Sequence, residues 1–212
     1  MEYEAAGNGS FLYDRGEAED RMKKLVTCKE MKDLDSTTIR EIGVPSEVLM
    51  ERAALKVVEE TEKYLEKNEK ILVVCGNGNN GGDGIAIARL FYLKGIRAEF
   101  YMVGNKEKMT RETTLQYKIA TGYHVPEVNN PDWSEYTTIV DAVFGVGLAR
   151  PIEGHYAKII HEMNSARAKK IAVDIPSGVN GDTGLEMGIA FSADLTVTFG
   201  YRKRGLCFYP GR

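Results

Sequence analysis

The fold of this chain is decided by residues 76–84, which have the sequence Gly-Asn-Gly-Asn-Asn-Gly-Gly-Asp-Gly. The apolar run at 71–75 predicts a buried strand before them, and residues 85–91 are apolar at helical spacing. Such a strand–turn–helix unit forms a phosphate cradle, because the first N–H groups of a helix lack partners and its dipole favours an anion. The five glycines are expected to allow positive φ and a close approach to a ligand. Three asparagines and Asp83 add polar groups that turning does not require.

Outward from this loop, helical and strand-like patterns alternate along the chain. A capping-box spacing at Thr27 and Glu30 starts a helix whose apolar stripe includes Met31, Leu34 and Ile42. The alternation predicts an α/β protein with a mostly parallel sheet and helices on both faces. The expected strands are 70–75, 97–103, 137–144, 170–175 and 193–199, with a short one at 122–128, and the expected helices are 27–42, 46–66, 85–94, 106–120 and 154–164.

The composition is that of an ordinary globular protein, with 212 residues of which 43% are hydrophobic and 28% charged. The net charge of −3 argues against a nucleic-acid-binding protein, for which a strongly basic domain is expected. No apolar run approaches the roughly 20 residues that cross a membrane, and the acidic N-terminus is unlike a signal peptide. Three widely spaced cysteines without a CxxC pair predict reduced thiols, a cytoplasmic location and no zinc site.

The domain organisation is expected to be simple. Residues 1–24 are acidic, contain glycine and show no period, which predicts a loosely ordered extension. Residues 25–212 are expected to form one domain.

Three segments should meet at the carboxyl edge of the sheet, where α/β proteins bind ligands: 76–84, 141–151 and 174–178. Burying the Asp141 carboxylate in a strand costs free energy unless it has a hydrogen-bonding or ionic partner. It could accept backbone N–H bonds or bind a cation, and spacing does not decide between the two. Asp174 is a candidate for acid–base work. Oxygen atoms of Asn80, Asp141 and Ser177 could converge on one hard cation.

A dinucleotide-binding dehydrogenase is the alternative suggested by Gly76-x-Gly78-x-x-Gly81. That fingerprint requires an acid at the end of the second strand to hold a ribose, and Glu99 lies within the strand instead. The three histidines are more simply surface or packing residues than a catalytic base: His124, His155 and His161.

Four motifs resemble, in order and spacing, those of the NAD(P)HX epimerase family, the YjeF N-terminal domain type. They are 79–84 (NNGGDG), 141–148 (DAVFGVGL), 174–178 (DIPSG) and 198–200 (TFG), and the likeness runs from about residue 25 to 212, including 45–54 (PSEVLMERAA). The resemblance implies a Rossmann-like three-layer α/β/α fold. It also implies epimerisation of hydrated, damaged NADH and NADPH, which carry a hydroxyl at C6 of the nicotinamide ring. Interconverting the R and S forms lets a partner dehydratase repair the S form.

The resemblance also implies the site residues. Asp174 would be catalytic and would protonate the leaving hydroxyl, and a potassium ion would be held by Asn80, Asp141 and Ser177. Lys203 falls where related sequences have a lysine, without an assigned role. The substrate would contact Asn79, Asn80, Gly81, Gly82, Asp83, Gly145, Val146, Gly147, Leu148, Ala149, Arg150, Pro151, Tyr156 and Asp174.

The sequence departs from the family pattern in two places. Val146 stands where threonine is commoner. The chain stops at Arg212, where relatives continue into a further strand or a fused dehydratase domain, so the domain is expected to be cut short before its last strand. A homodimer and the dehydratase are the expected partners. A non-catalytic binding module of the same fold is the remaining alternative.

Overall fold

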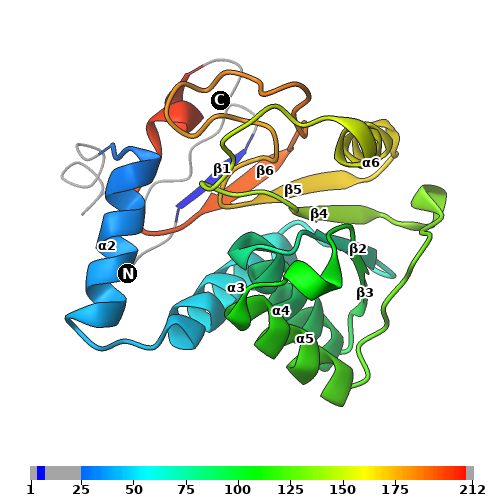
Figure 1. Cartoon of the computed structure of the whole chain (residues 1–212). Coiled ribbons are helices and arrows are strands. Elements are labelled where there is room, and N and C mark those ends of the chain that lie inside the picture. The colour runs from blue at the N-terminus through cyan, green and yellow to red at the C-terminus, as the bar shows by residue number, and fades with distance from the viewer. Residues whose placement is uncertain (1–3, 8–24, 209–212) are drawn as a thin grey trace.

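The computed structural model describes residues 4–7 and 25–208, and Figure 1 shows the whole chain. Its sheet has six strands in the order β1-β6-β5-β4-β2-β3. All neighbouring pairs are parallel except β1 and β6. The strands are β1 (Glu4–Gly7), β2 (Lys70–Cys75), β3 (Arg97–Met102), β4 (Thr138–Ala142), β5 (Lys169–Val173) and β6 (Leu195–Thr198).

The helices cover both faces of this sheet, which confirms the predicted α/β class with a mostly parallel sheet. In Figure 1, α3, α4 and α5 lie on one side of the sheet and α6 on the other, while α2 stands beside the strands. The α-helices are α2 (Cys28–Arg40), α3 (Ser46–Glu62), α4 (Asn79–Leu93), α5 (Arg111–Gly122) and α6 (Gly154–Ser165). Short 3-10 helices are η1 (Lys106–Lys108), η2 (Trp133–Glu135) and η3 (Arg204–Cys207).

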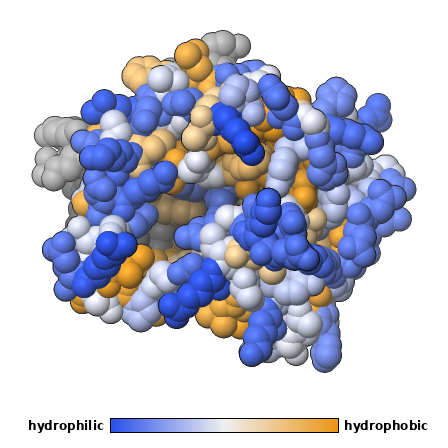
Figure 2. Space-filling view, viewed as in Figure 1, coloured by the Kyte–Doolittle hydropathy of each residue, from blue (hydrophilic) through white to orange (hydrophobic). Residues whose placement is uncertain are grey.

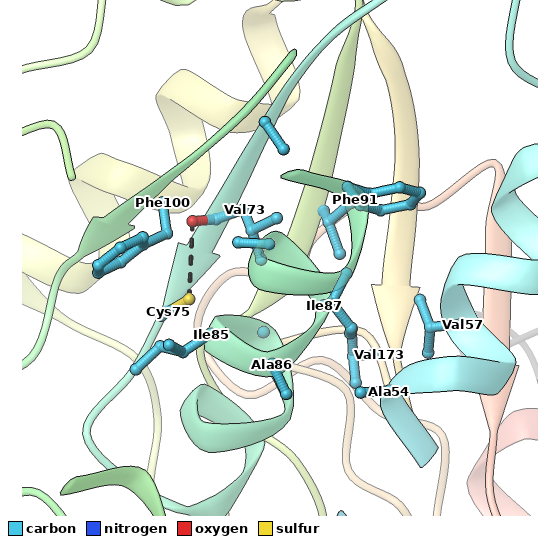
Figure 3. Close-up of a cluster of buried hydrophobic side chains, with 14 of the residues drawn as sticks. Ala54, Val57, Val73, Cys75, Ile85, Ala86, Ile87, Phe91, Phe100 and Val173 are labelled. Carbon is cyan, nitrogen blue, oxygen red and sulfur yellow. Dashed lines mark hydrogen bonds between the residues drawn. The ribbon is translucent and has the colours of Figure 1, made fainter. Parts of the chain in front are cut away.

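The core is divided by the alternation of side chains along β2. Ile71, Val73 and Cys75 pack with α3 and α4 in the larger apolar cluster, which Figure 3 shows around Val57, Phe91 and their neighbours. Leu72 and Val74 face the second cluster, beneath α6. Because both faces are covered, every residue of β2 after the first is buried.

The order in which the chain adds strands across the sheet reverses between β2 and β4, which are themselves parallel. From β2 the chain goes to β3 at one edge, then returns to β4 and continues to β5 and β6. The loops after β2 and β4 therefore flank the topological switch point, which is the usual ligand site of such sheets.

Four of the five glycines in residues 76–84 serve close packing, and a Cβ at the fifth, Gly78, would meet nothing within 4 Å. This corrects one expectation about the five glycines. None of them has positive φ. A Cβ at Gly81 would collide with the Gly76 carbonyl, and one at Gly84 would lie 2.5 Å from the Ala142 Cβ and 2.8 Å from the Cys75 Sγ. Helix α4 already begins at Asn79, earlier than predicted. Gly84 thus lets α4 pack closely on β2 and β4.

Several boundaries differ from the prediction. The expected helix at 106–120 is split, because Asn105 caps η1 and Thr110 caps α5 with their side chains. Residues 122–128 form only a bridge between Phe100 and Glu127. Residues 4–7 form β1 where no element was predicted, and the remainder of the acidic extension lies outside the described residues. None of the helices in the described ranges has the length and hydropathy needed to span a membrane.

The packing account predicts opposite effects for two glycine-to-alanine changes. Gly84→Ala should lower the free energy of unfolding by roughly 1–3 kcal/mol, because the new methyl group must displace Ala142 and Cys75. Gly122→Ala at the end of α5 meets nothing within 4 Å, so it should be neutral or gain up to about 1 kcal/mol. Urea unfolding of both variants measures this. Equal stabilities would contradict the packing role of Gly84.

Candidate active site

A cavity of about 780 Å³ opens between α2 and the carboxyl edge of the sheet. Its walls come from one face of α2, the start of α4, the start of α5, the loop after β4, and the segments after β5 and β6. Figure 2 shows the surface hollowed beside α2. The cavity therefore lies at the switch point, where the sheet topology places ligands.

Asp174 follows β5 in a strained conformation. Its φ is 68°, and the Ile175 N–H donates to the Val173 carbonyl at 2.9 Å, which closes a γ-turn around Asp174. Side chains other than glycine rarely adopt this region, and such strain occurs at functional sites when the surroundings enforce it. The backbone N–H of Asp174 is anchored to Val197 on β6 at 2.8 Å.

Lys203 holds the Asp174 carboxylate. Its ammonium donates to Asp174 Oδ1 at 2.5 Å, to Thr198 Oγ1 at 3.0 Å and to the Phe199 carbonyl at 2.8 Å. Oδ1 also accepts from the Thr198 hydroxyl at 3.2 Å and from the Phe199 N–H at 3.3 Å. The exposed fraction is 1% for Lys203 and 9% for Asp174. One oxygen of the Asp174 carboxylate is thus held by an ammonium, a hydroxyl and a backbone N–H together.

The segment before α2 fixes Lys203 from the other side. Val26 and Lys203 form a parallel bridge, in which the Val26 N–H donates to the Arg202 carbonyl and the Arg204 N–H to the Val26 carbonyl, both at 3.0 Å. The buried Lys203–Asp174 pair is therefore held in position by the ends of β5 and β6 and by the segment that precedes α2.

Asp141 and Ser177 form a second buried pair below the cavity. Asp141 is fully buried and accepts from the Ser177 hydroxyl at 2.6 Å, the Ser177 N–H at 2.7 Å and the Val143 N–H at 3.1 Å. Burial raises the pKa of the Asp141 carboxyl to about 6, although these hydrogen bonds oppose the rise. The Ser177 hydroxyl in turn accepts from the Phe144 N–H at 2.8 Å. The pair thus ties the DIPSG turn to the glycine loop after β4.

Asn80 faces the same glycine loop. A Cβ on Gly145 would lie 3.3 Å from the Asn80 amide carbon and oxygen. The Asn80 Nδ2 is buried without a hydrogen-bond partner among the described residues. A buried amide NH2 group without a partner indicates that an acceptor, such as a substrate oxygen, belongs beside it. Oxygen atoms from an amide, a carboxylate and a hydroxyl suit a hard cation such as potassium, so the predicted ligand set fits that ion chemically.

Two further carboxylates line the cavity without a partner. Within the described part of the chain, no hydrogen bond or ion pair engages Asp83 of α4 or Asp35 of α2. Burial raises the pKa of the Asp83 carboxyl well above its ordinary value, and the charges of Asp174 and Asp35 raise it further while Lys203 opposes them. Burial and the Asp174 charge also raise the pKa of Asp35, again against Lys203.

The structure brings together much of the substrate-contact set, without testing the contacts themselves. The residues of that set that line the cavity are Asn79, Asn80, Asp83, Gly145, Val146, Gly147, Leu148 and Asp174. Gly81 and Gly82 are buried in α4, and Ala149, Arg150 and Pro151 are outside the lining. Tyr156 supports the wall from behind, with its ring centroid 5.0 Å from that of Phe144.

Sequence reasoning did not assign a role to Asp35 or Lys203. Asp35 lies in a helix for which the sequence indicates only an apolar stripe, and the stripe residues Leu34 and Ile42 are exposed. For Lys203, the only sequence signal was its position shortly after the last strand, which places it near the edge of the sheet where ligands bind.

The described residues do not supply the ribose-binding acid that the dehydrogenase alternative requires. Glu99 accepts a hydrogen bond from the Tyr136 hydroxyl at 2.6 Å and lies 3.7 Å from the Lys70 ammonium, within β3 and outside the cavity lining. Just beyond the end of β3, where the ribose-binding acid would be expected, the chain has Gly104, which packs on Asn77. The three histidines are exposed and outside the lining.

Comparison with known proteins gives consistent matches. The family model described as YjeF-related protein N-terminus matches residues 46–205. An NAD(P)H-hydrate epimerase of Oenococcus oeni is 49% identical over 189 residues, covering 88% of this chain and 90% of that protein. Those of Limosilactobacillus fermentum and Levilactobacillus brevis are 45% and 43% identical, each over 90% of this chain and over 92% and 89% of the relative.

Among solved structures, the crystal structure of the yeast protein ynu0 matches with a TM-score of 0.75. The match covers 87% of this chain and 83% of that one, at 23% sequence identity. It supports the Rossmann-like fold.

Proposed function

The chain belongs to the family of YjeF-related protein N-termini, and from this membership and the site we propose that it is an isomerase that epimerises the hydrated nucleotides NADHX and NADPHX. The observation that carries the proposal is the strained Asp174, held by Lys203 at the cavity floor at 2.5 Å. A fixed charge at a switch-point cavity suits proton transfer with a bound nucleotide better than a purely structural role.

The cavity offers groups for both ends of such a substrate. As first residues of α4, Asn79, Asn80 and Gly81 have backbone N–H groups without acceptors inside the helix. These groups and the glycine loop after β4 would bind the pyrophosphate. The side chains of Lys32, Arg40 and Arg111 on the walls add positive charge. The nicotinamide ring would then lie toward the carboxylates.

Epimerisation at C6 needs no net redox change. The C6 hydroxyl gains a proton and leaves as water while the lone pair of the ring nitrogen forms an iminium. Water then adds to the other face and loses a proton. Asp174 would move a proton at the C6 oxygen. With Lys203 fixing its position, Asp174 would take a proton from the entering water and return it when the reaction runs backward. The nearby carboxylates would stabilise the cationic intermediate.

Potassium is proposed as the ion held by Asn80, Asp141 and Ser177. The donors are all oxygen, one of them a buried carboxylate whose charge has no cation nearby among the described side chains. The ion would offset the Asp141 charge and fix the glycine loop after β4 to the start of α4.

The wider setting is proposed from the same function. A dehydratase that consumes the S form would act together with this chain, as a separate or a fused protein, and a homodimer is the expected assembly. Cys28, Cys75 and Cys207 are free thiols, which supports a cytoplasmic location.

Purified protein should convert the R form of the substrate to the S form faster than the spontaneous reaction. Asp174→Asn should lower the rate about 10²–10⁴-fold, because the proton-transfer group is lost. Chiral separation of the two forms measures both rates, and melting curves check folding. Since Asn leaves Lys203 unpaired, Asp174→Asn combined with Lys203→Met provides an inactive variant without an unpaired buried charge. No conversion by folded wild-type protein would contradict the function, and full activity of Asp174→Asn would remove Asp174 from it.

Potassium should stabilise the folded protein. Binding at 100 times Kd adds about 2.7 kcal/mol, which corresponds to a rise in Tm of roughly 5–10 °C for a chain of this size. Melting curves in potassium chloride and lithium chloride of equal ionic strength measure the effect, with Asp141→Asn as the variant that should not respond. Identical Tm values of the wild type in both salts would contradict the site.

A further inference from the structure

Helix α2 forms one complete wall of the cavity. Its lining residues recur at spacings of one, three and four, and thus occupy a single face of the helix. They are Met31, Lys32, Asp35, Ser36, Ile39 and Arg40. The face is polar apart from Met31 and Ile39, so hydrophobic packing against the sheet does not account for it.

The wall is firmly held in place. Thr27 and Glu30 complete the capping box, with the Thr27 N–H donating to Glu30 at 2.7 Å. The Cys28 N–H donates to Asp182 at 2.7 Å. Met31 is buried against Gly200, where a Cβ would lie 2.5 Å from its methyl group. Asp35, one turn beyond Met31, therefore has a fixed position over the segment that carries Lys203.

Asp35 and Asp174 have opposite surroundings in the same cavity. The Asp174 carboxylate accepts hydrogen bonds from an ammonium, a hydroxyl and a backbone N–H. Asp35 is half-buried, and no donor engages it within the described ranges. Where two carboxyl groups share a site, such a contrast assigns the proton to the one without donors. Burial and the neighbouring Asp174 charge raise the pKa of Asp35, which points the same way.

The charged groups that face Asp35 come from several elements. Lys203, Asp174 and Asp83 lie at the sheet edge and on α4, and Lys32 and Arg40 are on its own helix. Arg111 and Glu112 line the cavity from α5, where Arg111 pairs with Glu47 at 3.3 Å and Glu112 accepts from Ser46 at 2.9 Å. Lys203 is bound to Asp174, and no ion pair engages Asp35 within the described ranges.

We propose that Asp35 is a second catalytic residue, which donates the proton to the departing C6 hydroxyl while Asp174 accepts a proton from the water that enters on the opposite face of the ring. This inference rests on the proposed function. It adds a proton donor for the departing hydroxyl beside the proton acceptor Asp174.

The two proton transfers balance. Asp35 gives its proton to the C6 hydroxyl, the C6–O bond breaks, water leaves, and the nitrogen lone pair forms the N1=C6 iminium. A water molecule then bonds to C6 through its oxygen, loses a proton to Asp174, and the electron pair returns to the ring nitrogen. The products are the epimer, ionised Asp35 and protonated Asp174. Exchange with solvent restores both groups, and the reverse reaction uses them in swapped roles.

Three variants on α2 test this role. Asp35→Asn removes the proton but keeps the shape, and Asp35→Glu keeps the acid. Asp33→Asn is the matched control, because the Asp33 side chain is 67% exposed on the same helix and, within the described part of the chain, forms an ion pair with Lys29 alone, at 3.6 Å. Melting curves establish folding, and kcat and KM for the R-to-S conversion are measured from acid to alkaline pH.

Asp35→Asn should lower kcat about 10²-fold or more while KM changes little, and Asp35→Glu should regain part of the rate. Wild-type kcat should fall as the pH rises through the pKa of Asp35, because only the protonated acid donates, and this alkaline fall should vanish in Asp35→Asn. Asp33→Asn should match the wild type.

Wild-type kcat in Asp35→Asn, or a change confined to KM, would overturn the catalytic role while leaving the epimerase function intact. An unchanged alkaline fall in Asp35→Asn would overturn it too, since another acid, such as Asp83, would then supply the proton. If Asp35→Asn does not fold, kcat of Asp35→Glu decides, because a carboxyl group moved by one methylene should donate its proton more slowly, and a kcat equal to that of the wild type contradicts the role. Absence of activity in the folded wild type would contradict the proposed function itself, and this inference with it.

Discussion

The buried ion pair between Lys203 and Asp174 is the interaction on which the site depends. Burying two charges is favourable only with close geometry and further hydrogen bonds, and here all three ammonium protons have acceptors. Those acceptors come from the ends of β5 and β6, and Val26 holds the lysine segment from the other side. The pair thereby closes the sheet edge and enforces the positive φ of Asp174. Strain at this residue is maintained by the surrounding fold.

Around this pair the cavity separates two kinds of carboxylate. Asp174 and Asp141 accept several hydrogen bonds each, and both connect loops that follow neighbouring strands. Asp83 and Asp35 face the cavity without donors among the described residues. Differences in protonation between similar groups are how one site performs acid and base steps at a single pH. The same negative charges would favour a cationic ring, while the α4 N-terminus and the basic walls suit an anionic tail.

The sequence predicted the sheet and the meeting of its loops well, because apolar strands and glycine-rich turns are local signals. The prediction that the glycines of residues 76–84 adopt positive φ was wrong. The close contact of Gly84 with β2 and β4 cannot be predicted without knowing which strands are neighbours. For Asp141, spacing left two alternatives, and the structure shows the backbone N–H bonds without excluding a cation. Asp35 and Lys203 could not be placed, since each depends on how α2 and the chain after β6 fold onto the sheet edge. The sequence indicated an apolar stripe on α2, and it could not show that part of that helix faces an open cavity.

The central claim is that the reacting ring lies on the Lys203–Asp174 pair. A crystal structure of the protein with a bound reduced nicotinamide dinucleotide, grown in potassium, tests it most directly. The account predicts that the ring enters the cavity with C6 within one water molecule of the Asp174 carboxylate, and that the pyrophosphate lies at the start of α4. A nicotinamide ring bound away from Asp174, on the far side of the α4 N-terminus or outside the cavity, would contradict it.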